Sequence, residues 1–587
     1  MIDVLTSVPP GLILIFGALL IPLLPRDGSG RPTAAKVLML VLPVVGFMQV
    51  YLLADGYTLN VEAFGLELEL VRVDKLAKVW GYIFHIAALL SVIYALHVDD
   101  RTQHTSAVMY AGCAIGAVFA GDLITLFLYW EGTAVTSVFL IWARATEEPE
   151  RAERNYKVGM RYLVVQVGSG VLLLAGAVLW MQGPGEGSLS FTQGAFSFET
   201  LADATPAQLV LLLSFGIKAA FPFLHNWMQD AYPEATATGT VWLSAFTTKL
   251  AIYALARGFG GTSVLIPIGA MMTAFPIFYA VIENDLRRVL SYSLNNQLGY
   301  MVVGVGIGTD MALNGTAAHA FSHILYKGLL FMSMGAVLHR VKTVNGSDLG
   351  GLWKSMPWTT VFCCIGAASI SAFPLFSGFV SKSLILTAAA EEHYTITFLV
   401  LLFASAGVCE HSGIKIPFFA FFARDSGKRV KEAPLNMLVA MAIASALCIG
   451  IGSFPGPLYD LLPFQVDFHP YTTTHVVTQL QLLLFSAAAF IFLLKFGLYP
   501  PELRSTNIDF DWTYRKALPA TVRGVRRVGG EAWDGVVSGA VKRIRGFLTW
   551  MGGHAGPAGV LGEPWPTGVT TFWAALLLGL YLLLEYL

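Results

Sequence analysis

Charged residues are scarce in this chain. Asp, Glu, Lys and Arg make up 13% of its 587 residues, whereas a soluble protein carries about 25%. Apolar residues account for 55% of the chain. This composition excludes an ordinary soluble domain and predicts an integral membrane protein. The net charge of −1 offers no basic surface to nucleic acid, so no nucleic-acid partner is expected.

Cysteine is also rare. The five cysteines, all in apolar runs, are Cys113, Cys363, Cys364, Cys409 and Cys448. No CxxC pair and no Cys/His cluster has the spacing of a metal site. We expect small buried side chains. The sequence therefore predicts no metal, no cofactor and no catalytic chemistry of the chain's own.

Long apolar runs, by contrast, are abundant. A membrane-spanning helix needs about 20 apolar residues, and windows of that length predict about sixteen helices. They cover roughly 10–25, 34–54, 76–97, 105–120, 122–142, 158–181, 207–224, 237–256, 263–282, 288–308, 313–339, 357–377, 394–422, 435–454, 475–498 and 569–586. The N-terminus lacks a basic region, so the first run is expected to be a retained span. Residues 57–73 alternate in polarity and predict a short hairpin outside the membrane.

Lys and Arg are nearly missing from every second connection between the predicted helices. The loops 182–206 and 455–474 contain neither residue. The opposite set of connections is basic, except around 226–236. Because basic connections stay in the cytoplasm, both termini are expected on the external side of a bacterial cytoplasmic (inner) membrane.

The segment 499–568 mixes Trp, Phe, Val and Ile with Arg and Lys. This mixture favours an amphipathic helix lying in the membrane interface on the cytoplasmic side. The stretch GPAGVLGEPWPTG (556–568) is expected to end that helix before a last span.

Two segments resemble each other within the chain. KAAFPFLHNW (218–227) and SAFPLFSGFVSK (371–382) each place a proline inside a predicted span, with a lysine nearby. Proline breaks a helix, and broken helices in two halves of a chain are typical of transporters built from repeats. The predicted segments are N-terminal transmembrane helices (1–104), a first inverted repeat (105–257), a second (258–422), C-terminal core helices (423–498), the amphipathic segment (499–568) and a final transmembrane helix (569–587).

Several titratable residues lie inside the predicted spans, where charge is costly and points to function. The candidate site residues are Glu131, Lys218, Lys249, His319, His323, Lys327 and Lys382. A lysine out of water binds its proton less tightly, and a histidine titrates near neutrality, so such groups can pass protons along. Asp122, Glu410, His411 and Lys415 could serve either structure or a pathway, and their roles stay open.

His319, His323 and Lys327 recur at a spacing of four residues. Four residues rotate a helix by about 40° beyond a full turn, so these side chains form a column on one face. We expect a proton relay through this column. Metal binding by the two histidines is an alternative, although no third ligand accompanies them locally.

Four motifs together resemble a known family. They are ENDLRRVLSYSLNNQLGYM (283–301), HAFSHILYKGLLF (319–331), LGGLWKSMP (349–357) and FPLFSGFVSK (373–382). They resemble the antiporter-like membrane subunits shared by respiratory complex I and Mrp-type cation/proton antiporters, over roughly residues 70–450. The resemblance implies fourteen core helices with two inverted five-helix repeats and broken seventh and twelfth helices.

The resemblance also implies roles for the candidate residues. Glu131 and Lys218 match a pair that acts together, and Lys249 matches the eighth-helix lysine of some members. His319, His323 and Lys327 match the eleventh-helix relay, and Lys382 matches the terminal group of the twelfth helix. The stretch 411–437 is most similar to the D-type subunits of Mrp antiporters.

The implied function is that of a proton-translocating subunit in a multisubunit monovalent cation (Na⁺)/proton antiporter. Its partners would be other antiporter-like and small helical membrane subunits. Three alternatives remain open: a proton-pumping subunit of a complex I-like NADH-quinone oxidoreductase or hydrogenase, a proton-coupled inorganic-carbon uptake subunit, and a non-conducting scaffold.

Overall fold

The structure is a computed structural model that describes residues 6–28, 30–63, 65–505, 507–528, 530–556, 559 and 566–586. Its chain contacts divide it into two compact units, 1–507 and 508–587.

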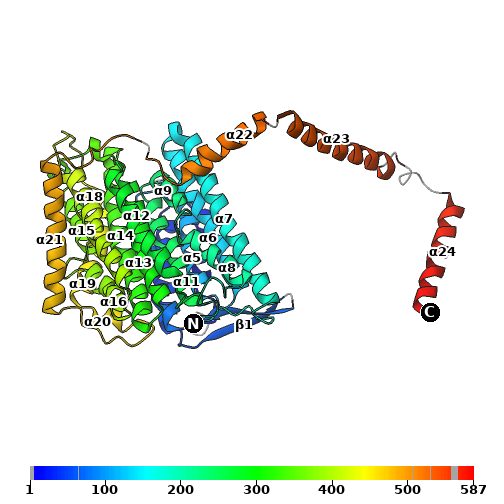
Figure 1. The fold of residues 1–587 in the computed structure, drawn as a ribbon, viewed down its shortest axis with the longest axis horizontal. Helices are drawn as coiled ribbons and strands as arrows, with labels where there is room; N and C mark the ends of the chain where they lie inside the picture. The colour runs from blue at the N-terminus through cyan, green and yellow to red at the C-terminus, as the bar shows by residue number, and fades with distance from the viewer. Residues whose placement is uncertain are drawn as a thin grey trace. The chain divides into compact units, whose positions relative to one another are not determined.

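The first unit is a bundle of helices that run side by side (Figure 1). Its first half contains α2 (Leu12–Leu20), α3 (Thr33–Leu52), α4 (Lys75–Ala95), α5 (Arg101–Phe119), α6 (Leu123–Glu147), α7 (Ala152–Gln182), α8 (Pro206–Lys218), α9 (Asn226–Ala231), η3 (Tyr232–Glu234), α10 (Gly239–Ala245) and α11 (Thr247–Gly258). Its second half contains α12 (Leu265–Ile282), α13 (Leu286–Ile307), α14 (Asp310–Val341), α15 (Pro357–Ile370), α16 (Ser377–Glu391), α17 (Thr395–Val408), η6 (Cys409–Ile414), α18 (Lys415–Pro417), η7 (Phe418–Phe422), α19 (Leu435–Ser453), α20 (Gly456–Tyr459) and α21 (Thr473–Lys495).

Among the described residues of the whole chain, ten helices are long and apolar enough to cross a membrane. Three shorter apolar helices, at 12–23, 206–218 and 357–370, add to them. The prediction of a mostly helical membrane protein is confirmed, while the sixteen spans and the inverted repeats stay predictions. The predicted hairpin is also confirmed: β1 (Thr58–Ala63) pairs antiparallel with β2 (Leu66–Arg72).

Two helix breaks share one backbone pattern. After α8, Ala220 and Phe223 have positive φ angles of 61° and 69° around the proline of the first AFP segment. After α15, Ala372 and Leu375 have φ angles of 58° and 72° around the second. Left-handed conformations are uncommon outside glycine and gather at functional sites. The short sequence similarity therefore corresponds to two matching strained turns, and each positive-φ residue of the second turn lies 152 residues after its counterpart in the first.

The candidate span 237–256 is interrupted, which the sequence did not predict. α10 ends at Ala245 and α11 begins at Thr247, with Phe246 between them at φ −103° and ψ −67°. No proline or glycine marks this position. The interruption places Lys249 in the first turn of a new helix.

Short acidic and hydroxyl side chains begin several of these helices. Asp122, whose role the sequence leaves open, is buried and accepts hydrogen bonds from the backbone N–H groups of Ile124 and Thr125, both at 2.8 Å. The Thr125 hydroxyl also donates to it, at 2.6 Å. Such a residue satisfies backbone donors that a helix start leaves unpaired. Asp122 is therefore the N-terminal cap of α6.

Replacing Asp122 with alanine is expected to destabilise the protein by about 1 kcal/mol, because the first donors of α6 lose their acceptor. Asp122→Asn keeps a capping oxygen and serves as the matched control. The thermal unfolding temperature of the detergent-solubilised protein measures the effect. If Asp122→Ala unfolds at the wild-type temperature, the cap contributes nothing to stability.

The second unit is helical in the described residues. It contains α22 (Leu518–Val528), α23 (Gly530–Ala555) and α24 (Thr567–Tyr586). Helices thus form within the segment predicted to be amphipathic, and α24 corresponds to the predicted last span. Most of the stretch expected to end the amphipathic helix lies outside the described residues.

Candidate functional site

Lys218 lies at the end of α8, fully buried against α6. Its Nζ donates to the backbone carbonyl of Trp130 at 2.7 Å and to the Thr133 hydroxyl at 3.0 Å. Glu131 interacts with it electrostatically, but the buried Glu131 Oε1 accepts no hydrogen bond from the described residues. Glu131 and Lys218 therefore lie on neighbouring helices. The lysine is held by the Trp130 carbonyl and the Thr133 hydroxyl of α6 rather than by the Glu131 carboxylate.

Lys249 and Lys382 both bind carbonyl oxygens at helix interruptions. Lys249 Nζ donates to the Ser244 carbonyl at 2.6 Å, at the end of α10. Lys382 Nζ donates to the Ile370 carbonyl at 2.7 Å, in the last residue of α15. Helix ends leave carbonyls unpaired and carry partial negative charge. Each interruption thus provides a binding position for a buried ammonium group.

His319, His323 and Lys327 lie in the middle of α14 and are fully buried. The rings of His319 and His323 have centroids 6.0 Å apart, as the column on one helix face requires. Both ring nitrogens of His323 and the Nζ of Lys327 have no hydrogen-bond partner among the described residues. The described residues also contain no group of three His, Cys, Asp or Glu side chains placed to hold a metal ion.

The residues of the α14 column interact electrostatically with Lys249 and Lys382. Among the charged groups, Lys249 has the largest electrostatic interaction with both His323 and Lys327, and Lys382 has the largest with His319. Lys382 Nζ also lies 5.4 Å from the centre of the Tyr300 ring, whose centroid is 6.0 Å from that of His319. The α14 column therefore lies within electrostatic range of both lysines at the helix interruptions, and Tyr300 lies near both Lys382 and His319.

A chain of hydrogen bonds sets the tautomer of His319. It starts at the Thr273 carbonyl, which can only accept, and receives the Asn296 amide N–H. Asn296 Oδ1 then accepts from Gln297 at 2.6 Å, and Gln297 Oε1 accepts from the Tyr326 hydroxyl at 3.1 Å. Since Tyr326 has donated its only hydrogen, His319 Nε2–H donates to it, at 3.4 Å.

The other ring nitrogen of the neutral His319 is consequently an acceptor. Its Nδ1 lies 3.1 Å from the Ser381 hydroxyl, which must donate to it. Ser381 directly precedes Lys382 on α16. The column is therefore joined to the second broken helix by a hydrogen bond of defined direction.

Several side-chain hydroxyls lie between Lys218 and Lys249. The sequence did not indicate them, because they carry no charge. Ser137 is four residues beyond Thr133 on α6, and its hydroxyl is 2.8 Å from that of Tyr162. Tyr162 interacts in turn with Thr247, two residues before Lys249. Hydroxyls can both donate and accept, so these residues offer intermediate positions for a proton between the two lysines, although the hydrogen bonds of the described residues do not join them into one continuous chain. Serine and threonine are common in membrane helices, and only their placement in space singles these out.

Tyr162→Phe is expected to slow proton transport about fivefold, since the loss of one hydrogen bond corresponds to roughly 1 kcal/mol. Tyr156→Phe, at an exposed position on the same helix, serves as the control. The initial rate of pH-gradient formation in vesicles measures the effect. Equal rates for both variants would exclude Tyr162 from the path.

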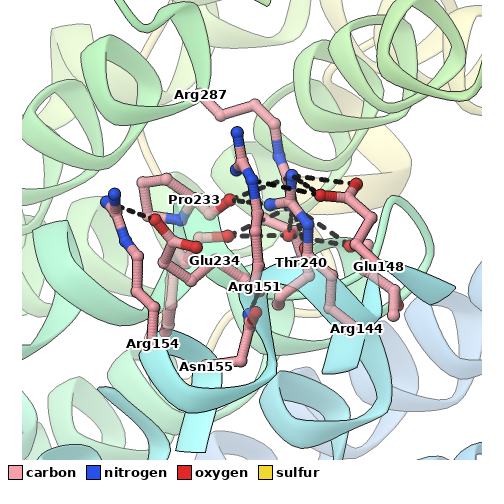
Figure 2. Close-up of polar contacts among 12 residues, drawn as sticks. Arg144, Glu148, Arg151, Arg154, Asn155, Pro233, Glu234, Thr240 and Arg287 are labelled. Atoms are coloured by element: carbon pink, nitrogen blue, oxygen red, sulfur yellow. Dashed lines mark hydrogen bonds and ion pairs between the residues drawn. The ribbon is translucent and has the colours of Figure 1, made fainter. Parts of the chain in front are cut away.

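Arginines surround the connection 226–236. This is the one connection, among those predicted to be basic and cytoplasmic, that contains no Lys or Arg of its own. Figure 2 shows Arg144 and Arg287 pointing at the Pro233 carbonyl, which they approach to 2.7 and 3.1 Å, and Arg154 at Glu234. Arg161 binds Asp230 in the same connection. Arginines of α6, α7 and α13 thus supply the positive charge that this connection lacks. Arg287 is fully buried, and its further contacts fix the segment that leads into α10.

The comparisons with known proteins agree with this architecture. The family described as NADH:quinone oxidoreductase/Mrp antiporter, transmembrane, matches residues 120–408, a range that contains all seven candidate residues. The chain belongs to the family of antiporter-like membrane subunits shared by respiratory complex I and Mrp antiporters. The expectation drawn from the four motifs is confirmed.

Similar sequences come from several kinds of complex. Hydrogenase-4 component B of Escherichia coli is 26% identical over 65% of this chain and 61% of that protein. One Na(+)/H(+) antiporter subunit of Alkalihalophilus pseudofirmus is 29% identical over 59% of this chain and 72% of its own length. Another antiporter subunit of the same organism is 27% identical over 66% of this chain, and the match spans 53% of that protein. Part of each relative therefore has no counterpart in the matched region.

Two solved structures share the fold. A chain of the Mrp complex from Dietzia sp. superimposes with a TM-score of 0.74 at 21% identity, over 92% of this chain and 62% of that one. A chain of the membrane-bound sulfane sulfur reductase, an archaeal respiratory membrane complex, gives 0.69 at 20% identity, over 98% of this chain and all of the other. The antiporter-like fold therefore extends across nearly the whole chain.

Proposed function

We propose that this chain translocates protons as one component of a multisubunit Mrp-type Na⁺/H⁺ antiporter. The observation that carries the proposal is the buried series from Lys218 through Lys249 and the α14 column to Lys382. Buried ionisable groups in a membrane bundle are costly unless they serve a pathway. Here they lie within reach of hydroxyls, amides and helix-end carbonyls that continue the series.

In this proposal protons are taken up near Lys218 and Lys249, pass the α14 column and leave near Lys382. Glu131 favours the charged form of Lys218 and so adjusts how readily it releases its proton. The two matching helix breaks belong to two inverted five-helix repeats. Both termini lie on the external side of a bacterial cytoplasmic membrane.

The test uses inverted vesicles that contain the complete complex and hold an acid-inside pH gradient. Adding Na⁺ is expected to dissipate the gradient, and adding K⁺ is expected to do so much less. Vesicles that carry the Lys218→Ala, Lys327→Ala and Lys382→Ala variants should lose the Na⁺ response while the complex still assembles. A full response in all three variants would refute proton transfer through this series.

One observation favours a second candidate, a proton-pumping subunit of a redox-driven complex. The similarity to the sulfane sulfur reductase chain covers 98% of this chain, including the second unit, and component B of a hydrogenase is among its relatives. The same vesicles distinguish the two. A pH gradient that forms only on addition of an electron donor, with no response to either cation, would favour the redox complex over the antiporter.

A further inference from the structure

His411 is a buried histidine to which the proposed path gives no role. It lies in η6, a π-helical turn that follows α17 and precedes α18. Its side chain is fully buried. Turns of this kind insert an extra residue into a helix and occur frequently at functional sites. Two further observations, its hydrogen bonds and its charged neighbours, indicate what His411 does.

The hydrogen bonds around His411 set its tautomer. The Ser412 hydroxyl donates to the Ser293 hydroxyl of α13 at 2.7 Å. Ser412 has a single hydrogen, so the 2.9 Å bond between His411 Nδ1 and Ser412 Oγ has the ring N–H as its donor. The lone pair of the neutral ring is then on Nε2. That atom is buried and has no hydrogen-bond partner among the described residues. His411 therefore presents an unused basic nitrogen inside the bundle.

Three lysines act electrostatically on His411. Lys327 has the largest electrostatic interaction with His411, followed by Lys415 and Lys382. Lys327 and Lys382 come from α14 and α16, which belong to the proposed path. Two of these groups protonated together would repel each other, since opposite charge close by is needed to hold both protons. A proton on His411 and a proton on Lys327 consequently compete.

Lys415 differs from the other two lysines. Its Nζ donates to the carbonyls of Val281 and Glu283 at 2.6 and 2.7 Å, and it pairs with Glu502 at 2.9 Å. These contacts compensate its charge and fix it at the end of α12. Lys327 Nζ, by contrast, has no hydrogen-bond partner within the described part of the chain. Lys327 is thus the neighbour whose proton is free to move.

We propose that His411 is an additional proton-carrying residue of this path, which exchanges a proton with Lys327. This inference rests on the proposed function. In the exchange an N–H bond of the Lys327 ammonium breaks and an N–H bond forms at His411 Nε2, directly or through water. The positive charge moves from α14 to the π-helical turn and leaves Lys327 neutral. Lys327 can then accept the next proton from the side of Lys249.

The test compares two buried histidines. His411→Asn keeps a donor for Ser412 but cannot carry a proton. His85→Asn is the matched control, because His85 is also buried in a span, holds a backbone carbonyl at 2.7 Å through Nδ1 and has an Nε2 without a partner among the described residues, yet no lysine acts on it there. His411→Asn is expected to slow pH-gradient formation about 10²-fold and to change its pH profile, whereas His85→Asn should match the wild type.

Lys382→Ala, measured beside these variants, distinguishes a failure of the His411 role from a failure of the proposed proton path. If Lys382→Ala loses transport while His411→Asn keeps the wild-type rate and pH profile, the role of His411 is wrong and the path stands. If Lys382→Ala retains transport, the path itself is wrong.

A second pair of variants applies if His411→Asn does not assemble. Ser293→Ala removes the acceptor that sets the direction of the Ser412–His411 hydrogen bond, without altering the histidine. Ser291→Ala on the same helix is the control, because its hydroxyl donates to the Arg287 carbonyl one turn earlier in that helix. Slower transport in Ser293→Ala alone supports the proposal, and equal rates in the two variants overturn it.

Discussion

Lys382→Arg is expected to reduce proton transport about 10²-fold, the size of effect typical when a proton-transfer group is lost. The side chain binds the Ile370 carbonyl at the end of α15. An arginine there can still donate a hydrogen bond and still carries positive charge, but it does not release its proton in a protein. The substitution therefore keeps the electrostatic and structural role of the lysine and removes only its ability to become neutral.

Lys354→Arg serves as the control for that prediction. Lys354 is half exposed and pairs with Asp425 at 2.8 Å, an interaction that arginine preserves. Both variants are compared by the rate of pH-gradient change in vesicles and by the yield of assembled complex. Normal transport in Lys382→Arg would mean that the lysine acts as a fixed charge at the helix break rather than as a proton carrier.

The titratable part of the site could be predicted from the sequence because charge stands out in apolar runs. Lys218, Lys249 and Lys382 were found in this way, and the spacing of His319 and Lys327 predicted a column that the structure contains. Their binding partners could not be predicted. Lys382 binds a backbone carbonyl, and every residue has one, so no sequence pattern marks Ile370 as its acceptor.

The connecting residues were missed for a related reason. Tyr162 and Thr247 carry only hydroxyls, and a hydroxyl in a membrane helix is more often paired with its own backbone than with a distant side chain. Gln297 belongs to the chain of hydrogen bonds that begins at the Thr273 carbonyl of α12 and ends at His319. Such links depend on how helices pack, which periodicity does not determine.

The helix breaks divide in the same way. Pro222 and Pro374 predicted two of the breaks, since proline removes a backbone donor. The interruption at Phe246 has no such marker, because a helix can also yield where packing favours another geometry. It coincides with Lys249, whose ammonium binds the Ser244 carbonyl at the end of the preceding helix. The chemistry of the site thus contributes to the fold at this point.

Arg287→Lys is expected to destabilise the protein by about 2 kcal/mol or more, because buried acceptors left without donors each cost about 1–3 kcal/mol. Arg287, in the first turn of α13, is fully buried and binds the connection drawn in Figure 2. Its Nη1 donates to the Pro233 carbonyl, and its Nη2, with two hydrogens, lies within hydrogen-bond distance of the Tyr232, Ala235 and Thr236 carbonyls and of the Thr240 hydroxyl. A lysine Nζ is a single donor atom, so it cannot occupy the positions of both Nη1 and Nη2 and leaves part of this set without a donor.

The segment that Arg287 holds leads directly into α10, whose Ser244 carbonyl binds Lys249. The same substitution is therefore expected to lower proton transport as well as the unfolding temperature of the solubilised complex. Arg288→Lys is the matched control, since the neighbouring arginine is partly exposed and 3.8 Å from Glu283. If both variants unfold at the wild-type temperature, the carbonyls of this connection are held by the helices themselves, and the position of Lys249 does not depend on Arg287.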